Sequence, residues 1–356
     1  MTWAKDAPIV IRRITNYYTV RYEGEELMCL PRARLKKEHV SILVGDRIQL
    51  EEIDLINRKA TISDVLPRFN QLPRPPIANI NQAIIVFAAD RPLFNPMQLD
   101  RFLVLSALSG IEAAIAINKS DLIEPSALEH LCEPYRNIGY TVVAVSAQTG
   151  DVEALRRLLI GKETVFAGPS GVGKSSLLNA IEPGLELKAA EVSEKISRGR
   201  HTTTFASLYP IEFPEGLALV ADTPGYSHLD FGNLLPTELG WYFPEMVEHL
   251  PHCRFPDCLH RDEPGCAVKE RATLHETRLA SYLKFLEELE ATQARLSSMS
   301  IKEEARVKRQ AASGGGQTRL IKLGVAERDA SRRTAKQRLQ DIDLEEEDDL
   351  DVLEDS

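Results

Sequence analysis

Residues 168–175 read Gly-Pro-Ser-Gly-Val-Gly-Lys-Ser and fit the pattern G-x-x-x-x-G-K-[ST], a loop that wraps the phosphates of a nucleotide. An apolar run at 164–167 predicts a strand before the loop, and residues 175–180 predict a helix after it. Glycines let the backbone curl so that its N–H groups point at anionic oxygens, and the helix N-terminus adds partial positive charge. The segment therefore predicts a phosphate site lined by Gly168, Pro169, Ser170, Gly171, Val172, Gly173, Lys174, Ser175 and Ser176.

The groups expected around the γ-phosphate and Mg²⁺ come from more than one segment. Lys174 would bridge the β- and γ-phosphates as a catalytic group, and Ser175 would place its hydroxyl on Mg²⁺. Asp222 follows an apolar run at 217–221 and begins the tetrapeptide Asp-Thr-Pro-Gly. Its carboxylate would hold Mg²⁺ through a water, while the backbone of Gly225 would bond the γ-phosphate.

Residues 199–204, Gly-Arg-His-Thr-Thr-Thr, lie between these two motifs. Thr203 is expected to complete the Mg²⁺ shell in the triphosphate state; the alternative is that the threonines simply begin a strand. Many GTPases carry a glutamine after the glycine of the second switch to orient the attacking water, but here that residue is Tyr226. Intrinsic hydrolysis should therefore be slow, or should use another group or a partner. His201 is the candidate for positioning water, and the alternative is that it packs or binds a partner.

A second loop predicts that the base is guanine. Asn118-Lys119-Ser120-Asp121 follows an apolar strand predicted at 113–117, at the sheet edge where ligands bind in open α/β folds. The Asp121 carboxylate can accept from both guanine N1–H and the exocyclic amine, and adenine lacks both donors. A strand predicted at 141–145 leads into Ser146 and Ala147, whose N–H would meet guanine O6. Alone, the first tetrapeptide could be a surface turn with a helix cap at Asp121.

The order of these motifs indicates a rearranged chain, because the base-reading loop precedes the phosphate loop, whereas it follows in most GTPases. Apolar strand runs alternate with helical patterns, which predicts a parallel sheet covered on both faces. We expect an α/β P-loop GTPase domain that is circularly permuted and spans 81–228. Its predicted strands are 83–88, 113–117, 141–145, 164–167 and 217–221, and its predicted helices include 97–109, 126–138 and 151–160.

The N-terminal region predicts a small β-barrel. Short strand patterns at 9–14, 17–22, 26–30, 47–52 and 60–65 suit an OB-like Greek-key barrel over residues 1–70. Basic residues interleave with these strands, and such barrels often bind RNA across one face. The alternative is an SH3-like barrel with an ordinary basic surface. The prolines that follow predict a linker at 71–80.

Four potential metal ligands lie close together near the C-terminus. The pattern Cys253-x4-Cys258-x-His260-x5-Cys266 brings three cysteines and a histidine within 14 residues. In a cytosolic chain such clustering favours a metal over disulfides, and Cys₃His is a closed structural zinc site. The alternative is chance packing of reduced cysteines. We expect a zinc-binding, α-rich module over residues 229–298, including a helix with apolar residues at Leu279, Tyr282, Leu283 and Leu286.

Charge is unevenly distributed over the 356 residues. The net charge is −10, and residues 341–356 alone hold ten acids and no base. Segment 302–339 carries eleven Lys and Arg against four acids, so the region 299–356 predicts a basic arm and an acidic tail, both disordered, with a nucleic-acid contact for the arm as one possibility. The N-terminus shows no apolar signal segment, and no apolar run approaches bilayer length. We therefore expect a cytoplasmic protein.

Motif order and flanking modules together resemble a known family, the circularly permuted ribosome small-subunit-dependent GTPase A of bacteria. The resemblance covers about residues 9–290 and implies GTP/GDP, Mg²⁺ and one structural zinc per chain. It also implies GTPase activity stimulated by the small (30S) ribosomal subunit, a role in late maturation of its decoding region, and catalysis by His201. The chain departs from the family pattern at 226–228, where Tyr-Ser-His replaces Phe/Val-Arg-Glu. Nothing is carried over to the tail.

From these features we expect a monomer that binds rRNA of the small subunit in the GTP state and leaves after hydrolysis, with no membrane contact. Two alternatives stay open. The first is a P-loop ATPase or a kinase acting on a small molecule, which the base preference set by Asp121 would distinguish. The second is an RNA-binding module whose nucleotide is structural, which phosphate release stimulated by the subunit would exclude.

Overall fold

The computed structural model describes residues 7–14, 16–73, 76–185, 207–222, 231–232 and 234–313, with the backbone alone at 73, 222 and 297–313. The expected residues His201, Thr203, Gly225 and Tyr226, and the tail beyond 313, lie outside the described residues. Met1–Gln293 form one compact unit, and Ala294–Ser356 form a second.

The first sheet contains the five strands predicted near the N-terminus. They are β1 (Ile9–Ile14), β2 (Tyr17–Tyr22), β3 (Glu25–Pro31), β4 (Ile48–Asp54) and β5 (Lys59–Val65), with the short helix α1 (Ala33–Lys37) after β3. Their order is β1-β2-β3-β5-β4, and only the β3–β5 pair is parallel. Alternate residues face a dry interior, because Val10, Val20, Leu27 and Ile62 are all fully buried.

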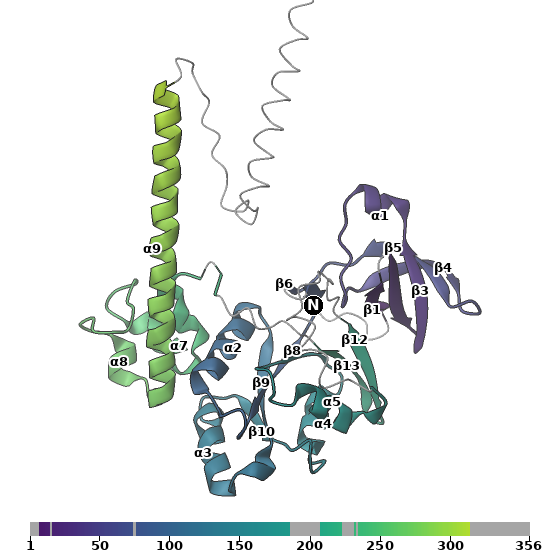
Figure 1. The fold of residues 1–356 in the computed structure, drawn as a ribbon, viewed down its shortest axis with the longest axis horizontal. Coiled ribbons are helices and arrows are strands. Elements are labelled where there is room, and N and C mark those ends of the chain that lie inside the picture. The colour runs from purple at the N-terminus through teal and green to yellow at the C-terminus, as the bar shows by residue number, and fades with distance from the viewer. Residues whose placement is uncertain are drawn as a thin grey trace, which may run out of the picture. The chain divides into compact units, whose positions relative to one another are not determined.

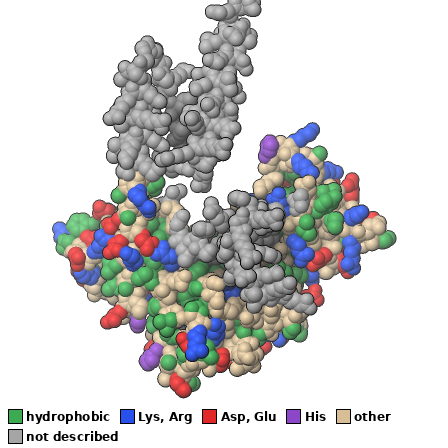
Figure 2. All heavy atoms as spheres, viewed as in Figure 1, with side chains coloured by type: hydrophobic (Ala, Val, Ile, Leu, Met, Phe, Trp, Pro, Cys, Tyr) green, Lys and Arg blue, Asp and Glu red, His purple; other side chains and the backbone are tan. Residues whose placement is uncertain are grey.

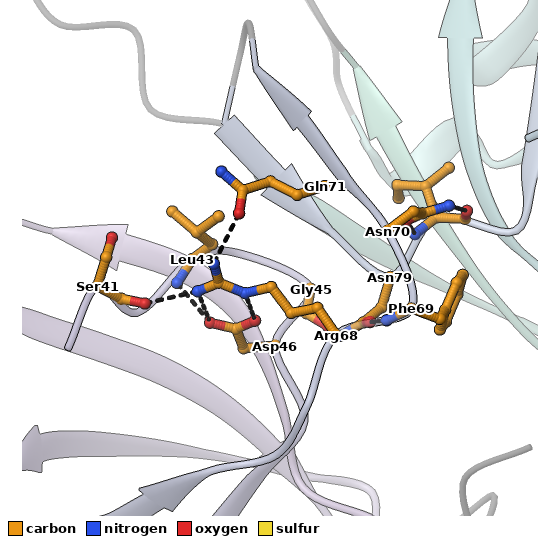
Figure 3. A network of polar contacts seen from close by, with 10 residues as sticks. Ser41, Leu43, Gly45, Asp46, Arg68, Phe69, Asn70, Gln71 and Asn79 are labelled. Atoms are coloured by element: carbon orange, nitrogen blue, oxygen red, sulfur yellow. Dashed lines mark hydrogen bonds and ion pairs between the residues drawn. The ribbon is translucent and has the colours of Figure 1, made fainter. Parts of the chain in front are cut away.

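The proline-containing segment after β5 is fastened to this first sheet (Figure 3). It forms a hairpin of β6 (Gln71–Pro73) and β7 (Pro76–Ala78). Arg68 makes two bonds to the buried carboxylate of Asp46, Nε to Oδ1 at 2.6 Å and Nη2 to Oδ2 at 2.8 Å. The amide of Asn79 donates to the carbonyl of Gly45 at 2.9 Å, so both ends of the segment hold the same turn.

The second sheet is built as a nucleotide-binding α/β sheet would be (Figure 1). Its strand order is β10-β9-β8-β11-β13-β12, and every neighbouring pair is parallel except β12–β13. The strands are β8 (Gln82–Ala88), β9 (Glu112–Asn118), β10 (Thr141–Ala144), β11 (Glu163–Ala167), β12 (Leu208–Phe213) and β13 (Gly216–Asp222). Parallel order brings the carboxyl ends of five strands to one edge, where ligands bind.

Helices cover both faces of this sheet. Helices α2 (Pro96–Leu108) and α3 (Pro125–Arg136) pack on one face through Phe102 and Tyr135. Helices α4 (Glu153–Leu159) and α5 (Lys174–Ile181) pack on the other through Leu155 and Leu178. The predicted two-sided parallel sheet is therefore confirmed, with the antiparallel edge strand β12 as an addition.

The two sheets share apolar packing. One cluster of buried residues joins Val10 and Val20 of the first sheet to Ile77 of the connecting hairpin and to Val165 and Leu219 of the second. Around this cluster, Arg21 of β2 donates to Glu212 of β12 at 2.5 Å, and Arg47 pairs with Glu163 of β11. The first sheet is thus packed against the second.

The C-terminal region is helical and forms its own core. Its elements are η3 (Pro236–Tyr242), α7 (Pro244–Val247), η4 (Leu250–His252), α8 (Ala267–Arg271) and α9 (Glu276–Ser313); the shorter turns η1 (Ser120–Leu122) and η2 (Pro183–Leu185) belong to the second sheet. Tyr282 and Leu286 of α9 are buried as the spacing predicts, but Leu279 is exposed. Acidic and basic side chains are interspersed on the surface here (Figure 2).

Among described helices, none is both apolar and long enough to cross a membrane.

Candidate functional site

The phosphate loop has a backbone shape that requires glycine. It connects β11 to α5, as predicted, and Gly168 and Gly173 have φ values of +137° and +93°. A Cβ on Gly168 would lie 2.1 Å from the carbonyl oxygen of Val86, and one on Gly173 would lie 2.4 Å from Nδ2 of Asn118. Side chains at either position would push the loop away from its neighbours. The curled backbone of the loop therefore requires glycine at positions 168 and 173.

Positive charge gathers inside the loop. The Nζ of Lys174 donates to the carbonyls of Gly168 at 2.9 Å and Pro169 at 2.8 Å, so the ammonium lies across the loop. Ser175 follows in the first turn of α5, whose N-terminal end adds partial positive charge. The residues present thus fit a polyphosphate, because a cation and a hydroxyl suited to Mg²⁺ lie together where the loop enters α5.

Asn118 joins three loops at the edge of the sheet. Its side chain is buried, with Nδ2 donating to the carbonyl of Val172 at 2.8 Å and Oδ1 accepting from the N–H of Ala147 at 3.2 Å. One amide therefore ties the phosphate loop to the loop that contains Ala147. Because a buried amide must satisfy both its donor and its acceptor, this contact fixes the relative position of the loops.

Lys119 and Asp121 extend this joint outward. Lys119 has a left-handed backbone, φ +59°, and its Nζ donates to the carbonyl of Gly171 at 2.9 Å and to that of Arg91. Asp121 is exposed, and one of its carboxylate oxygens accepts from the Ser146 hydroxyl at 2.5 Å. That bond orients the exposed carboxylate beside the loop that contains Ser146 and Ala147.

Most of the sequence-predicted nucleotide residues lie around this edge. Asp222 ends β13 in register with Phe166 of β11, directly before the phosphate loop. Ser120 is fixed by its hydroxyl, which donates to Val145 at 2.9 Å. Sequence reasoning did not identify Thr149, whose N–H donates to the hydroxyl of Ser146, or the carbonyl of Arg91. Backbone groups have no signature in composition or spacing.

The second site is a cluster of the four expected metal ligands. The ligand atoms of Cys253, Cys258, His260 and Cys266 all lie within 4.8 Å of one another. Nδ1 of His260 is 3.6 Å from Sγ of Cys253 and 3.5 Å from Sγ of Cys266. In a tetrahedral zinc site, bond lengths of about 2.3 Å to sulfur and 2.0 Å to nitrogen separate two such atoms by about 3.5 Å. The four residues therefore fit Zn²⁺ in a closed shell.

The surroundings of the cluster favour a metal as well. Burial lowers the pKa of His260, which keeps its ring neutral and its lone pair available. Burial raises the pKa of the Cys258 thiol to about 12, so a cation is needed to hold the thiolate. Glu263 accepts from the N–H groups of Leu259 at 2.8 Å and Arg261 at 2.9 Å, which fixes the turn that contains His260. The backbone N–H of Lys269 points at Sγ of Cys266.

Comparison with known proteins identifies the family. The model of the RsgA GTPase family matches residues 65–232. The small ribosomal subunit biogenesis GTPase RsgA of Caldanaerobacter subterraneus is 42% identical over 291 residues, which cover 80% of this chain and 96% of the relative. The protein of the same name from Moorella thermoacetica is 44% identical over 292 residues, 81% of this chain and 99% of the relative. The chain belongs to the RsgA GTPase family.

Two solved structures extend the likeness to the fold. YjeQ from Thermotoga maritima matches with a TM-score of 0.69 and 37% identity, over 80% of this chain and 98% of that one. YloQ, described as a circularly permuted GTPase, matches with a TM-score of 0.67 and 36% identity, over 80% and 95%. The predicted resemblance to permuted GTPases is thus confirmed. As a member of the RsgA GTPase family, this chain is a GTP hydrolase.

Proposed function

We propose that this protein hydrolyses GTP as a late assembly factor of the small ribosomal subunit, binding its rRNA in the GTP state and leaving after hydrolysis. The relatives are named for biogenesis of that subunit. The observation that carries the proposal is the joint at Asn118, since it holds the candidate base loop and the candidate phosphate loop together. Because the base loop and the phosphate loop keep a fixed relative position, a guanine nucleotide meets contacts for its base and its phosphates that are already in place.

Within this site, each predicted residue has a proposed role. Asp121 reads the guanine edge and Ala147 meets its O6, while the phosphate loop and Lys174 hold the triphosphate. Ser175, Thr203 and, through a water, Asp222 hold Mg²⁺, which when bound neutralises charge on the β- and γ-phosphates. Gly225 bonds the γ-phosphate, and His201 positions the attacking water. Tyr226 has no side-chain amide with which to orient this water, as a glutamine would, so GTP turnover without a partner is slow.

The flanking modules are proposed to grip the subunit. The N-terminal sheet would close as an OB-like barrel, and Lys and Arg side chains lie beside exposed apolar ones on its surface, which suits RNA (Figure 2). The Cys₃His cluster would hold one structural zinc per chain. We retain the domain limits 1–70, 71–80, 81–228, 229–298 and 299–356 as part of this proposal, together with a cytoplasmic monomer that makes no membrane contact.

A turnover assay tests the function. Purified protein is given GTP or ATP, with and without purified small subunits, and phosphate release is measured. The proposal expects slow GTP turnover that subunits accelerate at least about tenfold, and no turnover of ATP. Turnover of ATP at a similar rate would favour the alternative of a P-loop ATPase or kinase. GTP binding without turnover, even with subunits, would favour a structural nucleotide.

A further inference from the structure

Helix α2 belongs to two cores at once. Its residues Leu99 and Phe102 pack under the second sheet, whereas Val104 is buried in the C-terminal core. Two consecutive residues between these faces, Asp100 and Arg101, both reach α9. The helix is therefore the physical connection between the nucleotide-binding sheet and the metal-binding module.

Arg101 makes two cation–π contacts and an ion pair there. Its guanidinium carbon lies 4.9 Å from the ring centroid of Phe231 and 4.6 Å from that of Phe285, and the two rings are 5.1 Å apart. Nη2 donates to Glu288 at 2.7 Å. The side chain is 16% exposed, so these cation–π contacts are largely shielded from water, where they are strongest.

Phe231 is buried in the C-terminal core, where the residue is 8% exposed. By sequence, five residues separate it from Gly225, the residue proposed to contact the γ-phosphate. Phe231 is therefore close in sequence to the proposed γ-phosphate contact.

The opposite end of α2 adjoins the base loop. The helix begins after Asn95, whose side chain accepts from the N–H of Gln98 at 3.0 Å. Four residues earlier, the carbonyl of Arg91 accepts from Lys119. Arg101 thus lies on a helix that begins shortly after a contact with Lys119 of the base loop. Its middle contacts Phe231, which follows the second switch in the sequence.

We propose that Arg101 is a positioning residue for GTP hydrolysis, because it clamps Phe231 against α9 and so fixes the end of the segment that leaves the γ-phosphate. This inference rests on the proposed function and adds the element that passes the nucleotide state to the metal-binding module. Without the clamp, the nucleotide still binds through the base and phosphate loops, but the catalytic arrangement around the γ-phosphate is held less firmly.

The test replaces Arg101 with methionine, which retains length and apolar volume and removes the charge. We expect kcat for GTP to fall about tenfold while the Kd for GDP stays within about twofold of the original. A second readout uses Trp241, which lies in η3 and is 53% exposed. In a Trp3→Phe background, its fluorescence should differ between the GDP and GTPγS forms of the parent protein, and R101M should reduce that difference. R101K should recover part of both signals.

Arg156→Met is the matched control, since Arg156 of α4 makes the same kind of contact elsewhere, 4.9 Å over the ring of Phe213 of β12, and pairs with Glu153. It should keep the parent kcat. If the parent is active and R101M keeps both its kcat and its Trp241 fluorescence difference, the clamp is overturned while the proposed function stands. An equal fall of kcat in R156M would also overturn the clamp. A parent without GTP turnover would overturn the proposed function too. If R101M does not fold, E288Q removes the ion pair with Arg101 and F231L removes one of its cation–π contacts. The kcat and the Trp241 fluorescence of these two variants then test the clamp.

Discussion

At the residue scale, Asp121 is the side chain proposed to set the choice of nucleotide. Its carboxylate is exposed, and the hydroxyl of Ser146 orients it through a 2.5 Å bond. The proposed function depends on this group accepting two hydrogen bonds from guanine. An amide in its place would keep the shape and reverse part of the hydrogen-bonding pattern.

Asp121→Asn should therefore weaken GTP binding at least about a hundredfold, because two charge-assisted hydrogen bonds are lost or reversed. Xanthosine triphosphate, which carries a carbonyl in place of the exocyclic amine, should gain affinity. Competition binding with a fluorescent nucleotide measures both changes. Asp64→Asn, on the first sheet, is the control and should leave both affinities unaltered. Equal affinity of the parent and the D121N variant for GTP would show that this loop does not read the base.

At the element scale, the C-terminal module depends on polar interactions that lie inside its packing. Arg278 of α9 is 1% exposed and donates to Asp100 of α2 at 2.7 Å and to Glu245 of α7 at 2.7 Å. Its guanidinium also lies 4.6 Å over the ring of Phe243. Burial raises the pKa of Asp100, and the charge of Arg278 opposes that rise. Two carboxylates and one cation are thus buried as a set.

Arg278→Met should destabilise the protein by about 3–5 kcal/mol, because two buried carboxylates lose their cation. Urea denaturation followed by circular dichroism measures the loss. Arg157→Met is the comparison, since Arg157 pairs with Glu153 at 3.1 Å with its side chain 75% exposed, and such pairs contribute less than about 1 kcal/mol. Similar losses in the two variants would contradict the importance assigned to the buried set.

Removing the proposed zinc should make the C-terminal module sensitive to acid. Burial lowers the pKa of His260 from its ordinary 6.5, so in the unfolded chain this histidine takes up a proton at a higher pH than in the folded one. Stability of the chelated protein should accordingly be fully present above pH 6.5 and decrease as the pH falls below it, by up to about 1.4 kcal/mol per pH unit. Thermal melts with and without a chelator, from about pH 5 to 8, measure this. In the chelated protein, H260Q should flatten the dependence, and a dependence that persists in H260Q would refute the assignment to this histidine.

Elements with strong local patterns could be predicted from the sequence, and those defined by partners could not. The glycine loop, the buried parallel strands and the four metal ligands each have a spacing that reflects one physical requirement. β12 was not among the strands predicted for this sheet, although a strand beginning at the threonines of 202–204 was an open alternative. It tolerates Pro210 because it lies at the sheet edge. The ties from Arg68 to Asp46 and from Asn118 to Val172 span 22 and 54 residues, so no local window contains them.

At the scale of the whole molecule, the permuted order of motifs leads the chain from the proposed γ-phosphate contact directly into the metal-binding module. The nucleotide state should therefore alter how the flanking modules engage a partner. We expect the form bound to a GTP analogue to bind small subunits at least about tenfold more tightly than the GDP form. Sedimentation with purified subunits measures the two affinities, and K174A, which should lose the distinction, is the control. Equal affinities in the two nucleotide states would exclude release by hydrolysis.

The apolar cluster shared by the two sheets has a consequence for how the protein comes apart. Val10 and Val20 belong to the same buried apolar cluster as Val165 and Leu219. Deleting the first 65 residues would therefore expose an apolar surface on the second sheet. A fragment beginning at the connecting hairpin should consequently aggregate instead of behaving as a free-standing enzyme. Heating the intact protein should melt both sheets in a single step.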